Sequence, residues 1–494
     1  MTQQSLKQAM GSLTSQGAAF CIAGLSAAAV LISGALSSKP VSALPAFARQ
    51  TGQPCATCHN GTYAQLTPFG RQFKLNGYTA GGTRCNDVPA VAVTPQNDVQ
   101  VPLSMMVISG FTHTQKDQPA PPTNRDGFAN GLKLNDNAIP VEGASIFLAG
   151  QLYCKLGSFA QVTYSRSNEA YFLDNTEFRY ADKFRFGTNN VLWGLFANNN
   201  PTLDDVWNTS PAWRIPGGGW QASTFAVAPQ APLIESLGGK VGGLGGYVFV
   251  NNTFYGAFGA YKNLDRKTQN VLGQGDNPAV FDGLAPYWRL AIEKNWGDFS
   301  LMAGTFGMYA SIIPDRTQTT FGDKFTDVGW DTQFQYLHGA HFLTLRASYV
   351  DEWTHLDGTF NLASGQATNN LKNHLSQLNL SATYAYNSIY SVTAGYFDVR
   401  GITDMDPNGV IPSYWTSGGT PNPSGSPNAR GEVLDFGFAP WSNGGPALYP
   451  WFNTRVGVQF THYDKTQGAS TNYDGAGRNA KDDDAVWLYS WMAY

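Results

Sequence analysis

The fold of this 494-residue chain is decided by the pattern in Leu103-Ser104-Met105-Met106-Val107-Ile108-Ser109-Gly110-Phe111-Thr112-His113-Thr114. In an extended strand, Leu103, Met105 and Phe111 fall on one face. The other face carries smaller or more polar residues, and Met106 lies on that face. This alternation is typical of a membrane strand with one face toward lipid and the other toward a barrel lumen.

Similar alternating runs recur to the end of the chain, and we expect about 16 strands of roughly 8 to 12 residues, the length that a tilted membrane strand needs. The expected strands are Leu103–Thr114, Ser145–Cys154, Ser158–Ser165, Glu177–Lys183, Asn190–Ala197, Val241–Val250, Thr253–Lys262, Tyr287–Lys294, Phe299–Tyr309, Asp327–Leu337, His341–Glu352, Leu375–Tyr386, Ile389–Val399, Glu432–Ala439, Trp451–Tyr463 and Ala485–Tyr494.

The connections between these strands alternate between tight turns, such as Asn251-Asn252 and Asn387-Ser388, and long polar loops, such as Asn198–Lys240 and Asp464–Asp484. Short periplasmic turns and long extracellular loops are the arrangement of outer-membrane barrels. The predicted fold is therefore an all-β, antiparallel outer-membrane barrel, and an even strand count places both termini in the periplasm. A soluble propeller is the alternative, but no repeat of about 40 to 50 residues is visible.

The composition agrees with a membrane barrel. Charged residues and aromatic residues each make up 13% of the chain, too little charge for an ordinary soluble surface. We expect Tyr, Trp and Phe at strand ends to form interfacial girdles against outer-membrane lipid. The net charge of −4 argues against nucleic acid binding.

The N-terminus reads as a secretory signal peptide over residues 1–43. It carries Lys7, an apolar run from Gly17 to Leu36 and the cleavage signal Val41-Ser42-Ala43. An uncleaved membrane anchor is the alternative. The mature chain would then hold a cytochrome segment over residues 44–90 and the barrel over residues 91–494.

Cys55-Ala56-Thr57-Cys58-His59 is the attachment signature of a c-type haem. Cys55 and Cys58 would each form a thioether with one haem c, and His59 would be an axial ligand of its iron. A dithiol redox pair is one alternative, and half of a zinc site completed by Cys85 is another.

The cytochrome segment contains one helix signal, with Thr67 as N-cap, Pro68 at N1 and Gly77 just past the end. Phe69 and Phe73 on this helix would contact the porphyrin or form the core of the segment. Arg71 and Lys74 on the same helix would pair with haem propionates or face the lumen.

The usual sixth ligands are absent from residues 44–88, which hold no methionine and no histidine besides His59. The iron would be open, or bound by Lys74 or Cys85, or bound by a residue of the barrel. Met106 is the expected barrel ligand, because it falls on the lumen face of the first strand. A β-bulge would reverse that parity. Cys85 and Cys154 would pair in an oxidising compartment.

The motifs around the haem signature resemble the fused outer-membrane monohaem cytochrome–porins of iron-oxidising bacteria. The resemblance is carried by Phe47-Ala48-Arg49-Gln50-Thr51-Gly52, Cys55-Ala56-Thr57-Cys58-His59, Leu66-Thr67-Pro68-Phe69-Gly70-Arg71 and Phe73-Lys74-Leu75-Asn76-Gly77-Tyr78, and more weakly by Asn199-Asn200-Pro201-Thr202. It implies oxidation of Fe(II) at the cell surface and haem binding by Cys55, Cys58 and His59.

The expected function is an oxidoreductase that takes single electrons from extracellular Fe(II) through one haem to a periplasmic cytochrome c. Loop carboxylates such as Asp464 and Asp482-Asp483-Asp484 would concentrate Fe(II). A conduit for another donor or acceptor is the second hypothesis. A diffusion porin with a haem-bearing plug is the third.

Overall fold

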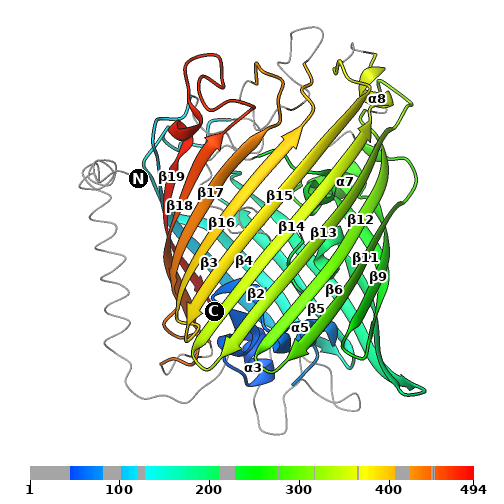
Figure 1. The fold of residues 1–494 in the computed structure, drawn as a ribbon, viewed down its shortest axis with the longest axis vertical. Coiled ribbons are helices and arrows are strands. Elements are labelled where there is room, and N and C mark those ends of the chain that lie inside the picture. The colour runs from blue at the N-terminus through cyan, green and yellow to red at the C-terminus, as the bar shows by residue number, and fades with distance from the viewer. Residues whose placement is uncertain are drawn as a thin grey trace.

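The computed structural model describes residues 45–81, 102–119, 128–210, 229–274, 279–315, 317–363, 367–405, 415, 422–446, 449 and 451–494. Within them, 16 strands form a closed antiparallel barrel, shown in Figure 1. Each strand pairs with its sequence neighbours, and the ring is closed between the first and last strands, where Ala493 lies opposite Met106. The predicted signal peptide and Cys85 lie outside the described residues.

The predicted barrel is confirmed strand by strand. The strands of the ring are β3 (Leu103–Thr114), β4 (Asn137–Tyr153), β5 (Leu156–Ser165), β6 (Ala170–Phe186), β7 (Asn189–Asn198), β8 (Val241–Val250), β9 (Phe254–Asn263), β11 (Ala285–Trp296), β12 (Phe299–Ile313), β13 (Asp323–His338), β14 (His341–His355), β15 (Lys372–Tyr386), β16 (Tyr390–Gly401), β17 (Ala429–Phe438), β18 (Asn453–Lys465) and β19 (Ala485–Ala493). The short strand β10 (Val280–Phe281) pairs with β12 and was not predicted.

Several strands run further toward the long loops than the hydrophobic alternation indicates. The largest difference in total length is in β6, which spans Ala170–Phe186 where the sequence pattern marks only Glu177–Lys183. The extra part of β6 pairs with β5 through Ala170–Leu173, and the register shifts at Asp174 and Asn175. A bulge interrupts the alternation of side chains along a strand, so the sequence pattern identified only the part of β6 that follows it.

The tight turns form where the sequence allows a left-handed backbone. Asn251 and Asn252 have φ values of 52° and 51°, and Asn387 and Ser388 have 55° and 51°. Two consecutive residues with positive φ are typical of the hairpin turn whose twist matches that of paired strands, and asparagine tolerates this conformation. The turns therefore fix the register of β8 with β9 and of β15 with β16.

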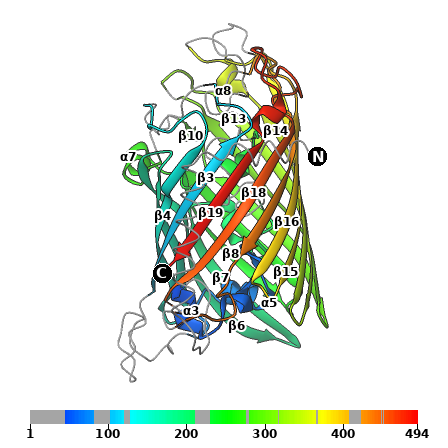
Figure 2. The same ribbon diagram turned by 90° about the vertical axis from the view of Figure 1, so that its left-hand side faces the viewer.

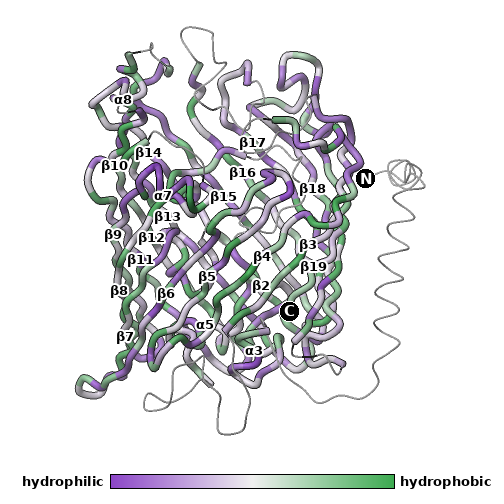
Figure 3. Tube along the Cα trace, turned by 180° about the vertical axis from the view of Figure 1, so that it is seen from behind, coloured by the Kyte–Doolittle hydropathy of each residue, from purple (hydrophilic) through white to green (hydrophobic). Residues whose placement is uncertain are grey.

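Apolar side chains face outward from the barrel. Exposed members of this outer face include Met105, Ile146, Leu195, Leu244, Leu290, Leu301, Leu380 and Leu434. Exposed aromatic residues gather near the tight turns, including Phe186, Phe254, Trp296, Phe299, Tyr386, Tyr390, Trp451 and Tyr494. In Figure 3, hydrophobic and hydrophilic positions alternate along the strands. No helix among the described residues is long and apolar enough to cross a membrane.

A small helical segment, residues 45–81, lies at the end of the barrel that carries the tight turns (Figures 1 and 2). We call it the plug. It contains α3 (Pro45–Thr51), α4 (Cys55–Cys58), β1 (His59–Asn60), β2 (Thr62–Leu66) and α5 (Pro68–Leu75). The remaining helices are η1 (Pro201–Asp204), α6 (Leu233–Ser236), α7 (Arg266–Val271), α8 (Asp357–Phe360) and η3 (Ala480–Asp483).

Candidate functional site

The Cys-x-x-Cys-His motif forms one helical turn followed by a short strand. Cys55 and Cys58 open and close α4, are 1% and 5% exposed, and form no disulfide. His59 follows directly as the first residue of β1. The motif therefore gathers two buried thiols and an imidazole, which is the donor set that covalent haem attachment needs.

The same burial raises the pKa of Cys55 and of Cys58 to about 12, because a thiolate is poorly solvated there. Thiol–disulfide exchange needs a thiolate at ambient pH. The thiols are thus unlike those of a dithiol redox pair. The zinc alternative depends on Cys85, which lies outside the described residues. Cys154 is disulfide-bonded, and its predicted pairing with Cys85 stays a prediction.

Helix α5 packs directly on the helical turn Cys55–Cys58, which we call the attachment turn. The Thr67 amide donates to the Cys58 carbonyl at 2.9 Å, and the Thr67 hydroxyl donates to the Thr57 carbonyl at 2.5 Å. A Cβ on Gly70 would lie 2.4 Å from the Cys58 carbonyl oxygen, so only glycine permits this approach. The predicted N-cap is confirmed, since the Thr67 Oγ1 accepts the Gly70 amide at 3.2 Å.

The predicted end of α5 at Gly77 is also confirmed. Gly77 has a φ of 66°, and the Tyr78 amide donates to the Phe73 carbonyl at 3.1 Å, as in a Schellman C-cap. Phe73 is buried against Phe47, with ring centroids 5.0 Å apart. Phe69 is 44% exposed. Phe73 therefore belongs to the core of the plug.

The attachment turn touches the barrel at the foot of β18. The Cys55 Sγ accepts a hydrogen bond from the Asn453 Nδ2 at 2.9 Å and lies 3.9 Å from the Tyr449 hydroxyl. The Ala56 amide donates to the Ser442 carbonyl at 3.0 Å. Tyr449 and Ser442 belong to the β17–β18 connection, so this connection covers the motif.

The plug contacts barrel strands around most of the ring. On one side, the Ala46 amide donates to the Ser104 Oγ of β3 at 2.9 Å. Five strands further round the ring, the Tyr247 hydroxyl of β8 donates to the Leu75 carbonyl at 2.6 Å. Further hydrogen bonds join Gln50 to Gln151, Asn60 to Thr344, Gln65 to Thr383 and Tyr78 to Glu177. The plug is therefore docked across the lumen and not beside the barrel.

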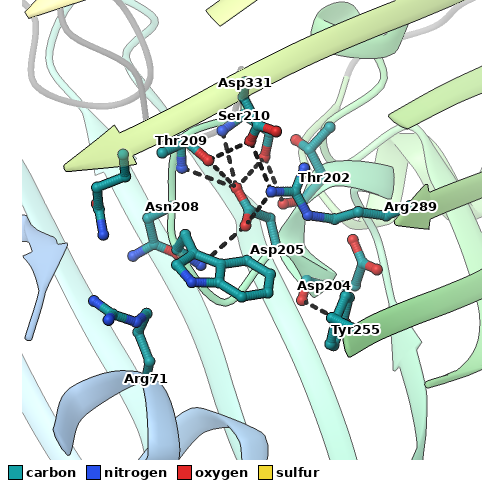
Figure 4. A network of polar contacts seen from close by, with 12 residues as sticks. Arg71, Thr202, Asp204, Asp205, Asn208, Thr209, Ser210, Tyr255, Arg289 and Asp331 are labelled. Carbon is teal, nitrogen blue, oxygen red and sulfur yellow. Dashed lines mark hydrogen bonds and ion pairs between the residues drawn. The ribbon is translucent and has the colours of Figure 1, made fainter. Parts of the chain in front are cut away.

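A second segment, residues 199–210 between β7 and β8, folds into the lumen, and we call it the lumen loop. All of its residues are buried. Its centre is Asp205, whose carboxylate accepts the backbone amides of Trp207, Thr209 and Ser210 at 2.8 to 2.9 Å. Arg289 of β11 lies 3.1 Å from Asp205 and 2.7 Å from Asp331 of β13 (Figure 4).

Asp204, the last residue of η1, and Asp205, which follows it, differ in pKa. Burial favours the neutral form of Asp205, but Arg289 and the Ser210 amide outweigh burial and lower its pKa to about 2. Burial raises the pKa of Asp204 to about 7, although Arg289 and Arg179 oppose the shift. Asp205 therefore carries the charge of the lumen loop, and Asp204 is protonated over much of the acidic range.

The plug and the lumen loop are joined by buried cations of α5. The Arg71 guanidinium is bidentate to Glu293 of β11, with both N–O distances 3.2 Å, and also donates to Gln335 at 2.6 Å. The Trp207 Nε1 of the lumen loop donates to the same Glu293 carboxylate. The Lys74 Nζ donates to the Asp205 carbonyl at 2.7 Å and to the Asn208 Oδ1 at 3.2 Å.

These contacts place Arg71 and Lys74 toward the lumen, one of the two roles expected from the sequence. Burial lowers the pKa of Lys74 to about 8, with Glu177 opposing this effect. Arg289, Glu293 and Asp331 were not predicted to contact the plug or the lumen loop. Their only signal in the sequence was a charged residue at a lumen-facing position of a barrel strand.

Met106 lies where the alternation predicts. Its side chain is 9% exposed and faces the lumen, whereas Met105 is 49% exposed on the outer face. The irregularity in β3–β4 pairing lies between Ile108 and Gly110, beyond Met106, so it does not reverse the parity. Met106 packs with Phe147 and Trp491, and Phe47 of the plug packs against the same cluster.

Several loop carboxylates already have partners. Asp482 forms an ion pair with Lys116 and Asp483 forms one with Arg478, each at 2.7 Å. Asp484 lies 2.7 Å from the His462 Nδ1. Ligand atoms of Glu432, His462 and Asp464 lie within 4.8 Å of one another, and Asp464 also pairs with Arg430 at 3.1 Å. This cluster lies at the long-loop ends of β17 and β18, far along the strand from Asn453.

Replacing Arg71 by Met should open the lumen. Glu293 would remain buried without its cation, and breaking a buried pair on one side costs about 3 to 5 kcal/mol. We expect single-channel recordings in planar bilayers to show more frequent open events for Arg71→Met than for the unchanged chain. Adding Glu293→Gln should restore part of the closure. The exposed Arg185→Met is the matched control, and equal conductance in both single variants would contradict the role of Arg71.

Asp204→Asn should stabilise the barrel in a pH-dependent way. A carboxyl whose pKa is raised on folding stabilises the folded state fully only below its unfolded pKa, and this stability is lost as pH rises through about 7. The variant should therefore gain free energy of unfolding over the unchanged chain as pH rises from about 4 to about 7. Urea unfolding in detergent at several pH values measures the difference, and a constant difference would refute the assignment.

No protein-family model matches the chain, and no curated protein matches it. Among solved structures, the barrel is similar to OmpF of Salmonella typhi in complex with daunomycin, at 14% identity and a TM-score of 0.40, covering 79% of this chain and 97% of that one. It is also similar to an anion-selective porin from Comamonas acidovorans, at 11% identity and a TM-score of 0.39, covering 79% and 98%. The porin-like barrel fold itself is established by the strand pairing of this chain.

Proposed function

We propose that this chain is an outer-membrane c-type cytochrome that oxidises extracellular Fe(II) and passes single electrons inward through one haem to a periplasmic cytochrome. The observation that carries the proposal is the position of the attachment turn. Cys55, Cys58 and His59 lie inside the lumen at the tight-turn end, on a plug that is bonded to strands around the ring.

The outer-membrane location is supported by the apolar outward face and by the aromatic residues gathered near the tight turns. In outer-membrane barrels the tight turns face the periplasm. The attachment turn would then lie near the periplasmic side, within reach of a soluble electron acceptor. Fe(II) would enter from the long-loop side, where Glu432, His462 and Asp464 gather, and would have to move down the lumen to reach the plug.

The donor set of the plug suits covalent haem c. Cys55 and Cys58 would hold the haem through two thioether bonds, and His59 and Met106 would bind its iron. When bound, the haem supplies reversible one-electron chemistry, which matches the change from Fe(II) to Fe(III). The buried wall around α4 excludes water from the motif, and burial with a thioether ligand favours a higher reduction potential.

Closure of the lumen supports a conduit over a diffusion porin. The plug, the lumen loop and their buried ion pairs fill the sector lined by β7 to β14 with a continuous core that includes Trp207, Phe249, Tyr255 and Phe306. A path for ions through that sector would have to break these contacts. Electrons would need no such path if the plug held a haem, because the haem would supply one-electron transfer. A conduit for another donor or acceptor would use the same filled lumen and the same plug. Experiments with different donors distinguish it from iron oxidation.

Mixing Fe(II) with the purified, haem-loaded chain tests the proposal. We expect the haem absorbance to change to that of the reduced form within seconds, followed in a stopped-flow spectrophotometer. Cys58→Ala should abolish covalent haem staining on denaturing gels, and His59→Ala should change the haem spectrum. His338→Ala alters an exposed histidine at the tight-turn end and is the matched control.

The rival functions give different results in the same assays. Reduction by dithionite but not by Fe(II) would overturn iron oxidation and leave a conduit for another donor. Free ion conductance of the haem-loaded chain in liposomes, without reduction by Fe(II), would favour the diffusion porin. Covalent staining that persists in Cys58→Ala and Cys55→Ala together would overturn the haem site itself.

A further inference from the structure

We propose that Trp491 of β19 is the positioning residue of the barrel's half of the haem site, and that it holds the Met106 thioether toward the plug. The inference rests on the proposed function, because it requires a haem on Cys55 and Cys58. It goes beyond that function by assigning a role to the last strand, which the sequence identified only as the end of the barrel.

The strand register brings Met106 close to the attachment turn. Asn453 of β18 lies opposite Ala493 of β19, and Ala493 lies opposite Met106 of β3. Neighbouring strands are about 4.8 Å apart, so Asn453 and Met106 are separated by about 10 Å along one row of the lumen face. Asn453 is also the residue that donates to the Cys55 Sγ at 2.9 Å. The register alone thus places a thioether sulfur near the motif.

The plug packs on the same row from the other side. Phe47 of α3 packs against the cluster that contains Met106, Phe147 and Trp491. Helix α3 is held there by the Ala46 amide, which donates to the Ser104 Oγ, two residues before Met106 on the same face. Met106 therefore lies at the boundary between plug and barrel, where a group carried by the plug would meet the barrel wall.

Small residues flank Met106 on the neighbouring strands. Its partners in the row are Ala493 on one side and Ser145 on the other. Ala149 and Ala493, which are 0% and 1% exposed, belong to the same apolar cluster. Lumen faces of porin-type barrels are polar. A buried apolar patch of this kind on the lumen face suits a flat apolar ring better than it suits water.

Trp491 orients the sulfur. The Trp491 Nε1 donates to the Met106 Sδ, and an indole N–H is a donor only. This contact restricts the rotation of an otherwise flexible side chain. Donation to the sulfur also withdraws electron density from it, so the sulfur would donate less to ferric iron and the reduced haem would be favoured. The expected effect of Trp491 is therefore on the reduction potential as well as on ligand geometry.

Trp491→Phe, in the full haem-loaded chain, tests the role because it keeps the ring and removes the donor. We expect the ratio of reduced to oxidised haem at a fixed ambient potential to fall about fivefold, the equilibrium equivalent of one net hydrogen bond. Trp487→Phe is the matched control. Trp487 also faces the lumen from β19, but its Nε1 donates to the Glu142 Oε2 at 3.0 Å. Removing that donor should therefore leave the ratio of reduced to oxidised haem unchanged.

Met106→Leu completes the design. It should remove the weak long-wavelength absorption band of thioether-ligated ferric haem, and Trp491→Phe should have no further effect on the ratio in that background. Folding of every variant is checked by heat-dependent mobility on gels. An unchanged ratio in Trp491→Phe would overturn the positioning role. An unchanged spectrum in Met106→Leu, with haem staining intact, would overturn the whole inference and leave the proposed function standing. Loss of haem staining in the unchanged chain would instead overturn the proposed function.

Discussion

The rest of the structure depends on the buried ion pairs that join the plug, the lumen loop and the barrel wall. Burying a charge is costly unless it is paired and its hydrogen bonds are satisfied. Asp205 meets this requirement with three backbone amides and Arg289, and Glu293 meets it with Arg71 and Trp207. Because the partners of each buried charge come from different segments, removing one partner would leave an uncompensated charge buried on another segment. The pairs therefore make the closed arrangement cooperative.

The packing inside the lumen determines which species can pass through the barrel. A porin-like wall normally surrounds water, but here the sector from β7 to β14 is filled by a packed core and by paired charges. The sector near β18, β19 and β3 is different, because its lumen face carries Trp491, Met106 and Phe147 and meets the attachment turn. The lumen is thus divided between a sector filled by packed side chains and paired charges and a sector with an apolar wall beside the attachment turn.

The sequence predicted the barrel well because the alternation of side chains in a strand has a local cause. Successive side chains point to opposite faces, so Met105 and Met106 could be assigned to lipid and lumen without knowledge of any partner strand. The cap at Thr67 and the helix end at Gly77 were predictable for the same reason, since both depend on residues within one helix. The extension of β6 to Ala170 was not predictable, because a register shift at Asp174 and Asn175 interrupts the alternation of side chains.

By itself, the sequence determined the strand alternation, the tight turns and a thiol–thiol–histidine motif of haem-attachment type. Only the tertiary structure decided where the motif lies and what surrounds it. Arg71 is 222 residues from Glu293 in the chain, and the Cys55 Sγ is 398 residues from its donor Asn453. Such partners meet only after the ring has closed and fixed the register of every strand. Their identity depends on the summed register of the barrel, which no local pattern of residues contains.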